Sequence, residues 1–192
     1  GITVTNAASQ NTIDNNTVQY VTLGSGILVD NSSGQRVINN DIGNVHLDGI
    51  ALTTEDGSMG CTGCMIAMNG VGLAGRAGIA LGKNSDSNSL LFNQIGVSAQ
   101  GNPAPLADGI HLTQDSDANL IDSNWVWFCG SDGLAIEDAS DGNQVVRNHL
   151  EWNAKDGLVI KFSFANQIGV GSTEANYIRW NQNSGVVIMD NA

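Results

Sequence analysis

Short bursts of alternating hydrophobic and polar residues run through the whole chain, separated by glycine, asparagine or aspartate. The stretch 132–160 shows the pattern clearly. It opens with Asp-Gly-Leu-Ala-Ile and starts again 24 residues later with Asp-Gly-Leu-Val-Ile. Alternation with a period of two predicts short, half-buried strands, and the constant spacing predicts a repeat architecture. No window shows the apolar stripe of an amphipathic helix, so we expect an all-β chain.

Three markers define the repeat. The first is a glycine before an alternating apolar pair: Gly1, Gly26, Gly49, Gly78, Gly109, Gly133, Gly157 and Gly185. The second is an asparagine two residues before an aliphatic residue: Asn16, Asn40, Asn69, Asn93, Asn124, Asn148 and Asn176. The third lies five residues before that asparagine: Asn11, Gln35, Cys64, Asn88, Asn119 and Asn143. Together they predict a parallel β-solenoid with three short strands per coil, a minimal repeat of 24 residues and about seven to eight coils.

The second-marker asparagines are best explained by structure. Stacked one above another, their amides can donate and accept hydrogen bonds between coils. Asparagine also tolerates the left-handed backbone that a sharp corner needs. We therefore expect a buried asparagine ladder rather than a site.

The order Asn-x-Ile-x-x-Asn-x-Ile, followed nine residues on by Asp-Gly-Ile-x-Leu, resembles the repeat of the pectate-lyase-like superfamily. The resemblance covers essentially the whole chain and implies one right-handed parallel β-helix domain over residues 1–192. Two Asn-Gln-Ile-Gly stretches, at 93–96 and 166–169, resemble those of secreted bacterial β-helix proteins and imply an extracellular or cell-surface location. The superfamily includes lyases, hydrolases, epimerases, adhesins and phage spikes, so the resemblance does not select an activity.

The charge of the chain narrows its partners. Nineteen acidic and seven basic residues give a net charge of −12. Nucleic acids and anionic membrane surfaces are therefore poor partners, and neutral or cation-bridged glycans fit better than polyanionic ones. The sequence has no apolar run long enough to span a membrane as a helix, so no membrane insertion is expected.

The two ends of the chain fall within strands and carry no evident cap. A solenoid that ends in unpaired strands invites edge pairing, and terminal repeats are normally atypical for that reason. We expect either a segment of a longer solenoid or copies that associate end to end.

The strand that follows each Asp-Gly pair offers candidate catalytic groups: Asp108, His111, Asp132 and Asp156. Carboxylates on adjacent or alternate coils would lie about 5 or 9.5 Å apart, distances that bracket the two geometries of glycoside hydrolysis. The placement resembles the polygalacturonase branch. It departs from that branch at Ser131-Asp132, where paired aspartates are expected, and at Asp156-Gly157, where Gly-His-Gly is expected. The alternative is that Asp-Gly only forms a corner.

A second candidate site follows the ladder asparagines. Alternation places their neighbours on the outer face, as an exposed stripe of ligand-binding residues: Trp125, Trp127, His149, Glu151, Tyr177 and Arg179. Stacked rings suit the faces of sugars, with Arg179 and Glu151 as hydrogen-bonding groups. The alternative is contact with a neighbouring chain. Phe128, Trp152 and Trp180 are expected to form a stabilising stack at the corner.

The acidic loops and the cysteines give weaker indications of function. Asp/Asn-rich loops at 30–33, 115–117 and 138–141 offer oxygen ligands for calcium, but none has the spacing of a defined calcium loop. No metal site and no other cofactor are predicted. Cys61, Cys64 and Cys129 are expected to be small buried hydrophobic residues, with a Cys61–Cys64 disulfide as the alternative.

Three functions remain open. The first is an extracellular structural or adhesive module that contacts glycans through the stripe. The second is a polysaccharide-processing enzyme, a hydrolase, lyase or epimerase, that uses the Asp-Gly face. The third is an assembly subunit. The largest insertions, at 96–106 and 169–174, leave from different corners, so we do not expect them to wall one groove.

Overall fold

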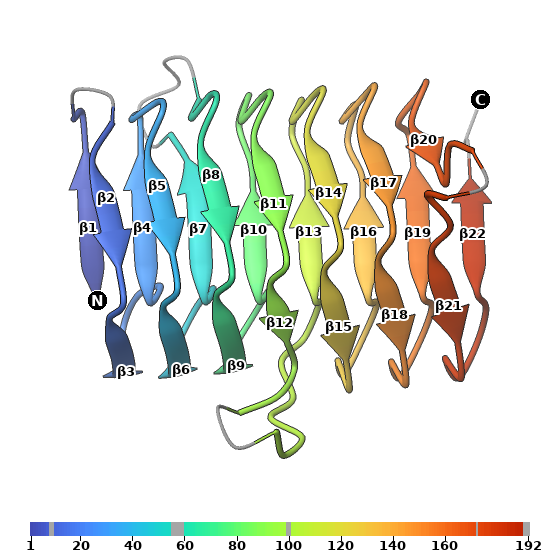
Figure 1. Cartoon of the computed structure of the whole chain (residues 1–192), viewed down its shortest axis with the longest axis horizontal. Coiled ribbons are helices and arrows are strands. Elements are labelled where there is room, and N and C mark those ends of the chain that lie inside the picture. The colour runs from blue at the N-terminus through green and yellow to red at the C-terminus, as the bar shows by residue number, and fades with distance from the viewer. Residues whose placement is uncertain (8–9, 55–59, 99–100, 172, 190–192) are drawn as a thin grey trace.

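The computed structural model describes residues 1–7, 10–54, 60–98, 101–171 and 173–189, and these form a parallel β-helix. The chain winds through three parallel sheets that run along a common axis (Figure 1). The described residues contain no helix, and hence no helix suited to crossing a membrane. The expected all-β solenoid is confirmed.

The strands are assigned here to sheets A, B and C. Sheet A has eight strands: β1 (Ile2–Thr5), β4 (Ile27–Asp30), β7 (Ile50–Thr53), β10 (Ile79–Leu81), β13 (Ile110–Leu112), β16 (Leu134–Ile136), β19 (Leu158–Lys161) and β22 (Val186–Met189). Sheet B has seven: β2 (Thr12–Asp14), β5 (Arg36–Ile38), β8 (Met65–Ala67), β11 (Ser89–Leu91), β14 (Leu120–Asp122), β17 (Gln144–Val146) and β20 (Gln167–Ile168). Sheet C has seven: β3 (Thr17–Val21), β6 (Asp41–Val45), β9 (Gly70–Ala74), β12 (Gln94–Ile95), β15 (Trp125–Trp127), β18 (His149–Glu151) and β21 (Tyr177–Arg179).

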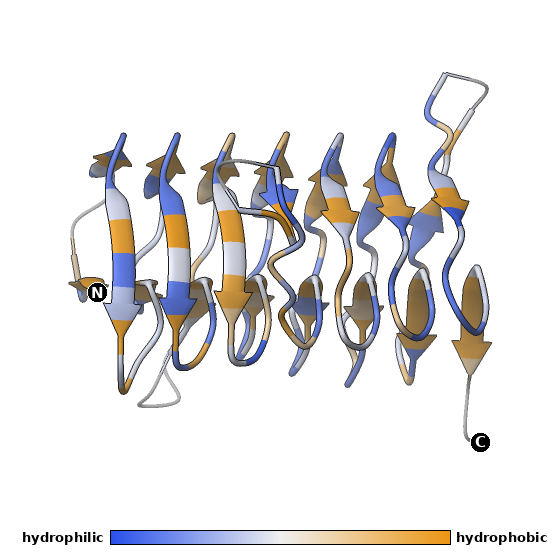
Figure 2. Ribbon diagram, turned by 90° about the horizontal axis from the view of Figure 1, so that it is seen from below, coloured by the Kyte–Doolittle hydropathy of each residue, from blue (hydrophilic) through white to orange (hydrophobic). Residues whose placement is uncertain are grey.

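Alternate residues of each strand fill the core. Bands of opposite hydropathy are visible along the strands nearest the viewer in Figure 2. In sheet A the register stacks one fully buried row through successive coils: Ile27, Ile50, Ile79, Ile110, Leu134 and Leu158. Because each row repeats side chains of similar size at strand spacing, the core is filled by stacks of similar aliphatic side chains from successive coils.

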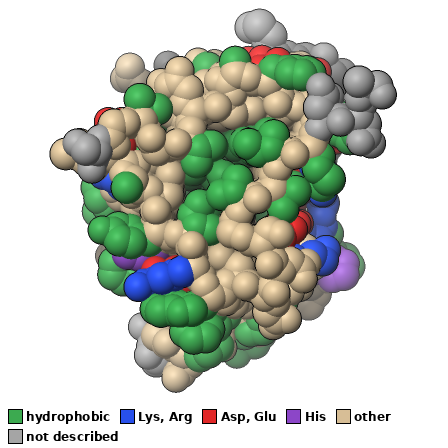
Figure 3. Space-filling model, turned by 90° about the vertical axis from the view of Figure 1, so that its right-hand side faces the viewer, with side chains coloured by type: hydrophobic (Ala, Val, Ile, Leu, Met, Phe, Trp, Pro, Cys, Tyr) green, Lys and Arg blue, Asp and Glu red, His purple; other side chains and the backbone are tan. Residues whose placement is uncertain are grey.

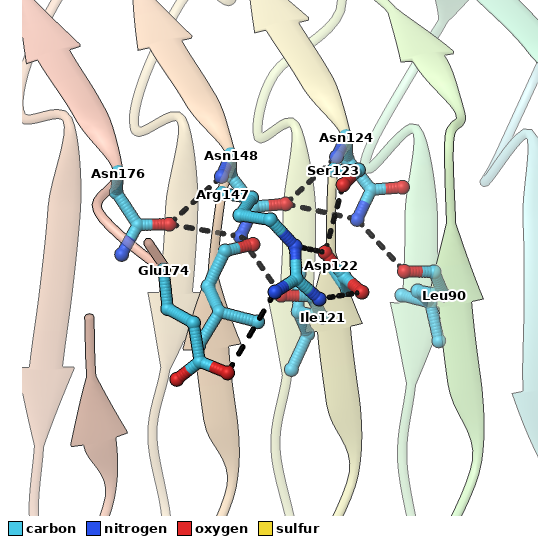
Figure 4. Close-up of polar contacts among 10 residues, drawn as sticks. Leu90, Ile121, Asp122, Ser123, Asn124, Arg147, Asn148, Glu174 and Asn176 are labelled. Atoms are coloured by element: carbon cyan, nitrogen blue, oxygen red, sulfur yellow. Dashed lines mark hydrogen bonds and ion pairs between the residues drawn. The ribbon is translucent and has the colours of Figure 1, made fainter. Parts of the chain in front are cut away.

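The asparagine ladder lies inside the corner between sheets B and C. Asn124 shows the arrangement: its backbone N–H and its Nδ2 both donate to Asn148 Oδ1, at 2.9 and 3.0 Å. Its Oδ1 accepts the same pair from Asn93. Its Nδ2 also donates to the Leu90 carbonyl (Figure 4). The ladder runs from Asn16 to Asn176, as expected from the second marker.

Left-handed residues mark both ends of sheet C. Before the ladder asparagine the φ angle is positive at Asn15, Asn39, Met68, Phe92, Ser123 and Arg147. Four residues after the ladder asparagine, near or just past the end of the sheet C strand, φ is again positive at Tyr20, Asn44, Leu73, Phe128, Trp152 and Trp180. Large side chains are unusual in this conformation, and here they stand at the two rims of sheet C.

The two outer strands of sheet A are β1 and β22. Figure 3 looks at the β22 end, where hydrophobic side chains lie inside a ring of backbone. Val186 and Ile188 of this strand are exposed. End-to-end association stays a prediction.

Candidate functional site

The predicted stripe lies on the outer face of sheet C. Trp125, His149 and Tyr177 are register partners on β15, β18 and β21. The ring centroids of Trp125 and His149 lie 5.2 Å apart, and those of His149 and Tyr177 lie 4.7 Å apart and nearly parallel. Trp125 is 44% exposed and Tyr177 is 56% exposed, which is unusual for large aromatic residues. Register therefore holds three rings in one accessible row.

Trp127, Glu151 and Arg179 form a second row two residues further along the same strands. Trp127 packs edge-on against Trp125, with centroids 4.9 Å apart. Glu151 lies on the outer face as expected, but it is only 5% exposed. Its Oε1 lies 2.9 Å from His149 Nδ1 and 3.2 Å from Arg179 Nε. Glu151 thus fixes both neighbours.

The corner rings are more accessible than expected. Trp152 and Trp180 are stacked with centroids 4.8 Å apart, which confirms the predicted stack for these two rings but not for Phe128. Both are about half exposed, at 50% and 53%, and the Arg179 guanidinium lies 3.9 Å from the Trp180 ring centre. They form a second aromatic row beside the stripe, at the rim towards sheet A.

A groove of about 670 Å³ borders the stripe at the opposite rim. Its lining residues are Phe92, Ser123, Trp125, Arg147, His149, Thr173, Ala175 and Tyr177. Arg147 is held in it by both carboxylate oxygens of Asp122 and lies 3.7 Å from Glu174 (Figure 4). The hydrogen bonds to Asp122 raise the pKa of Arg147.

The two insertions border the stripe at two different hollows, so they do not wall one groove, as expected from their corners. The first forms the loop that follows β12 (Figure 1) and folds back through a bridge between Val97 and Pro103. The carbonyl of Ala104 accepts a hydrogen bond from the Leu73 N–H. With Trp127 and Trp152 this insertion borders a shallow, open hollow of about 290 Å³. The second insertion supplies Thr173 to the larger groove, and Ala175 directly follows the insertion. Strand spacing does not encode the direction in which a loop folds, so the sequence could not show that both insertions border the stripe.

The carboxylates of the Asp-Gly pairs are used by the backbone. Oδ1 of Asp108, Asp132 and Asp156 accepts the N–H of the residue at the same position one coil further on, at 3.2, 3.0 and 2.8 Å. Asp48 does the same for Ala77 at 3.0 Å. The glycines are required by close approach: a Cβ on Gly109 would lie 2.3 Å from the Gly133 carbonyl oxygen. Corner formation therefore accounts for the motif.

His111 stands apart from this row. Its Nδ1 lies 3.9 Å from Asp108 Oδ2. Its Nε2 lies 3.5 Å from Glu137 Oε2 and is shielded from solvent, but the geometry makes no hydrogen bond. Glu137 is also bound by Lys161 at 2.7 Å, which raises the pKa of that lysine.

A groove of about 700 Å³ over sheet A reaches His111 and Asp108. Its floor is hollow because small residues, Ala51 and Ala80, occupy the outward positions of β7 and β10. Among the described residues, its lining includes neither Asp132 nor Asp156. The four candidate catalytic residues are therefore not gathered in one groove.

Sequence analysis missed Phe92, Arg147 and Glu174. The available signal was a bulky or charged residue directly before a ladder asparagine, where Asn15 and Asn39 stand in earlier coils. Phe92 and Arg147 adopt the left-handed backbone at this position and stand at the rim of sheet C. Glu174 lies two residues before Asn176, so this signal does not cover it.

The thiols and acidic loops are satisfied within the fold. All three cysteines are free and buried, and burial raises the pKa of Cys64 to about 11. Within the described ranges no three His, Cys, Asp or Glu side chains are grouped so as to hold a metal ion. In the acidic loops Asp117 accepts the Asp141 N–H and Asp141 accepts the Phe164 N–H, again as a backbone ladder.

The sequence matches the family described as the right handed beta helix region over residues 1–192, and the chain belongs to that family. It is similar in structure to a mutant of the periplasmic alginate epimerase AlgG, with 18% identity and a TM-score of 0.78 over 94% of this chain and 38% of that one. It is also similar to the A-module of the Azotobacter vinelandii mannuronan C-5 epimerase AlgE6, with 14% identity and a TM-score of 0.69 over 88% of this chain and 45% of that one. This chain thus spans less than half the length of these structures, and at such identity the likeness shows the fold. No match is found among curated proteins.

Proposed function

We propose that this protein binds a glycan on the outer face of sheet C. The observation that carries the proposal is the row of register-matched rings on three successive coils, Trp125, His149 and Tyr177, with two of them about half exposed. Flat apolar faces flanked by fixed hydrogen-bonding groups suit the two faces of a pyranose. The flanking insertions and the grooves beside them give a bound chain lateral walls.

The structural neighbours agree with this class of ligand, since both are named for polysaccharide chemistry. In this proposal the protein is an extracellular or cell-surface module with a structural or adhesive role. A rigid β-helix serves that role because successive coils fix the spacing of the rings.

The proposal is tested by affinity electrophoresis and calorimetry on a panel of soluble polysaccharides. Trp125→Ala and Tyr177→Ala are expected to weaken binding about 10- to 100-fold, the range for aromatic anchors. Tyr20→Ala is the matched control, because Tyr20 is 75% exposed and lies outside the stripe. Equal binding by all three variants would contradict the proposal.

A second candidate function is polysaccharide processing in the sheet A groove. The observation that favours it is His111, whose shielded Nε2 has no hydrogen bond while Asp108 and Glu137 lie close. A histidine between carboxylates suits proton transfer at a sugar carbon or a glycosidic oxygen. Asp108 or Glu137 would orient the ring, and Lys161 would hold Glu137 in place.

Product formation separates this candidate from binding alone. Polysaccharides incubated with the protein would be assayed for new reducing ends, for unsaturated products by ultraviolet absorbance, and for epimerised residues by NMR. His111→Ala is expected to abolish any product and to leave stripe binding intact, because His111 lies on another sheet. If no assay gives product, catalysis is excluded for the substrates tested and the binding function stands.

A further inference from the structure

Arg147 beside the stripe and Arg179 within it are each paired with a carboxylate. Arg147 is bound by Asp122 through two hydrogen bonds and lies 3.7 Å from Glu174. Arg179 is bound to Glu151. The bidentate contact with Asp122 leaves little of the Arg147 charge for a further anion, and the Arg179 charge is offset by Glu151, whose Oε1 lies 3.2 Å from Arg179 Nε. The stripe therefore has no unpaired arginine to receive a carboxylate from a ligand.

The fixed charges of the face are unfavourable to an anion. Asp122, Glu151 and Glu174 carry three negative charges against two positive charges on Arg147 and Arg179. Glu151 lies in the middle of the stripe and is only 5% exposed, so solvent screens it weakly. The faces of aromatic rings are also negative, which disfavours an anion placed over them.

The same groups suit the hydroxyls of a neutral sugar. Carboxylates accept hydrogen bonds from hydroxyl groups, and the Ser123 and Thr173 side chains in the groove can both donate and accept. The apolar ring faces of Trp125 and Tyr177 match the C–H faces of a pyranose. The groove extends from Phe92, just before β12, to Tyr177 on β21, across four consecutive coils, and so it follows the solenoid axis.

We propose that the glycan bound by the stripe is an uncharged polysaccharide chain lying along the solenoid axis, and that Glu151 and Glu174 exclude polyuronates. This inference rests on the proposed function of the stripe. The inferred ligand is uncharged, whereas a polyuronate is anionic, although the fold is shared with epimerases named for alginate and mannuronan.

The test compares one polymer in two charge states. Alginate and polygalacturonate would each be measured against their carboxyl-reduced forms, which keep the backbone linkages and lose the charge, with xyloglucan and glucomannan as further neutral probes. We expect binding to at least one neutral polymer that is lost in Trp125→Ala, unchanged between 50 and 500 mM NaCl, and at least tenfold tighter than to any polyuronate.

Glu174→Gln is the matched variant for charge. It keeps the size and an acceptor oxygen at the rim of the groove, removes one negative charge and leaves Arg147 with Asp122. In this variant the ratio of the affinity for a neutral polymer to the affinity for its anionic form is expected to fall several-fold. Trp125-dependent binding that is as tight for a polyuronate as for its reduced form would overturn the charge inference and leave the binding function intact. Trp125-independent binding, or none to any probe, would overturn both.

Discussion

The asparagine ladder and the aromatic stripe are built from neighbouring residues of the same coils. Asn124, Asn148 and Asn176 are followed directly by Trp125, His149 and Tyr177. Both rows stack in register, but Asn124 and Asn148 are fully buried whereas Trp125 and Tyr177 are about half exposed. Repetition along the axis therefore has two consequences one residue apart. The inner row forms the hydrogen bonds that the buried backbone groups need, and the outer row presents a surface whose side chains the fold does not need.

The Asp-Gly row lies between these extremes. Its carboxylates look like a catalytic set in the sequence, but each accepts a backbone N–H of the next coil. Ala77 takes the same place in the third coil, so the corner also closes without a carboxylate. The carboxylates of this row therefore stabilise the corners without being essential to them, and their hydrogen bonds to the backbone leave them less available for catalysis.

The largest expected effect separates the ladder from the stripe. Asn124→Ala should lower the free energy of unfolding by about 3 kcal/mol, because several buried donors and acceptors lose their partners. Asn16→Ala, at the part-exposed first position, should cost about 1 kcal/mol. Urea unfolding followed by circular dichroism measures both. Equal costs would show that burial does not govern the ladder.

The reverse pattern is expected for the stripe. Trp125→Ala should change the free energy of unfolding by about 1 kcal/mol or less, because the side chain is 44% exposed and mainly contacts Trp127 and His149. Its glycan affinity should nevertheless fall at least tenfold. Unfolding and calorimetry on one preparation test both statements. A stability loss as large as that of Asn124→Ala would assign Trp125 to the fold.

The repeat markers predicted the ladder and the strands because both depend on spacing alone. Asn93 to Asn124 spans 31 residues instead of 24, yet the ladder passes through unchanged, since the insertion lies outside the marker positions. Alternation also placed Trp125 and Tyr177 outward correctly. It could not show that Glu151 is buried by its partners, or that both insertions border the stripe, because these depend on side-chain packing and loop direction.

A smaller effect is expected in the Asp-Gly row. Asp132 is 8% exposed, and its Oδ1 accepts the Asp156 N–H. Asp132→Ala removes that acceptor and should cost about 1–2 kcal/mol of unfolding free energy. Asp132→Asn keeps an acceptor oxygen and should stay within about 0.5 kcal/mol of the parent. Thermal unfolding of the pair gives the comparison, and a loss of polysaccharide turnover in Asp132→Asn with stability unchanged would favour a catalytic role instead.

The smallest effect concerns Asp117, which belongs to another backbone ladder. Burial, together with the negative charges of Asp86, Asp141 and Asp115, raises the pKa of Asp117. Because the folded state then binds the proton more tightly than the unfolded state, the ionised group lowers stability at neutral pH, and this penalty disappears as the pH falls through the folded pKa to the unfolded value. Asp117→Asn keeps the oxygen that accepts the Asp141 N–H and removes the charge.

The variant should therefore be more stable than the parent by about 0.5 kcal/mol at pH 7, a figure already reduced for solvent screening. The gain should shrink as the pH is lowered towards 4. Asp14→Asn removes the same charge at an exposed position of the first coil and should give no gain beyond about 0.2 kcal/mol. Urea midpoints at a series of pH values measure the difference. A gain that persists at about pH 3, roughly one unit below the unfolded-state pKa of aspartate, where Asp117 is largely protonated in both states, would show that packing rather than charge limits this ladder. The row of Asp117 and Asp141 would then resemble the asparagine ladder, in which hydrogen bonding and packing rather than charge set the stability.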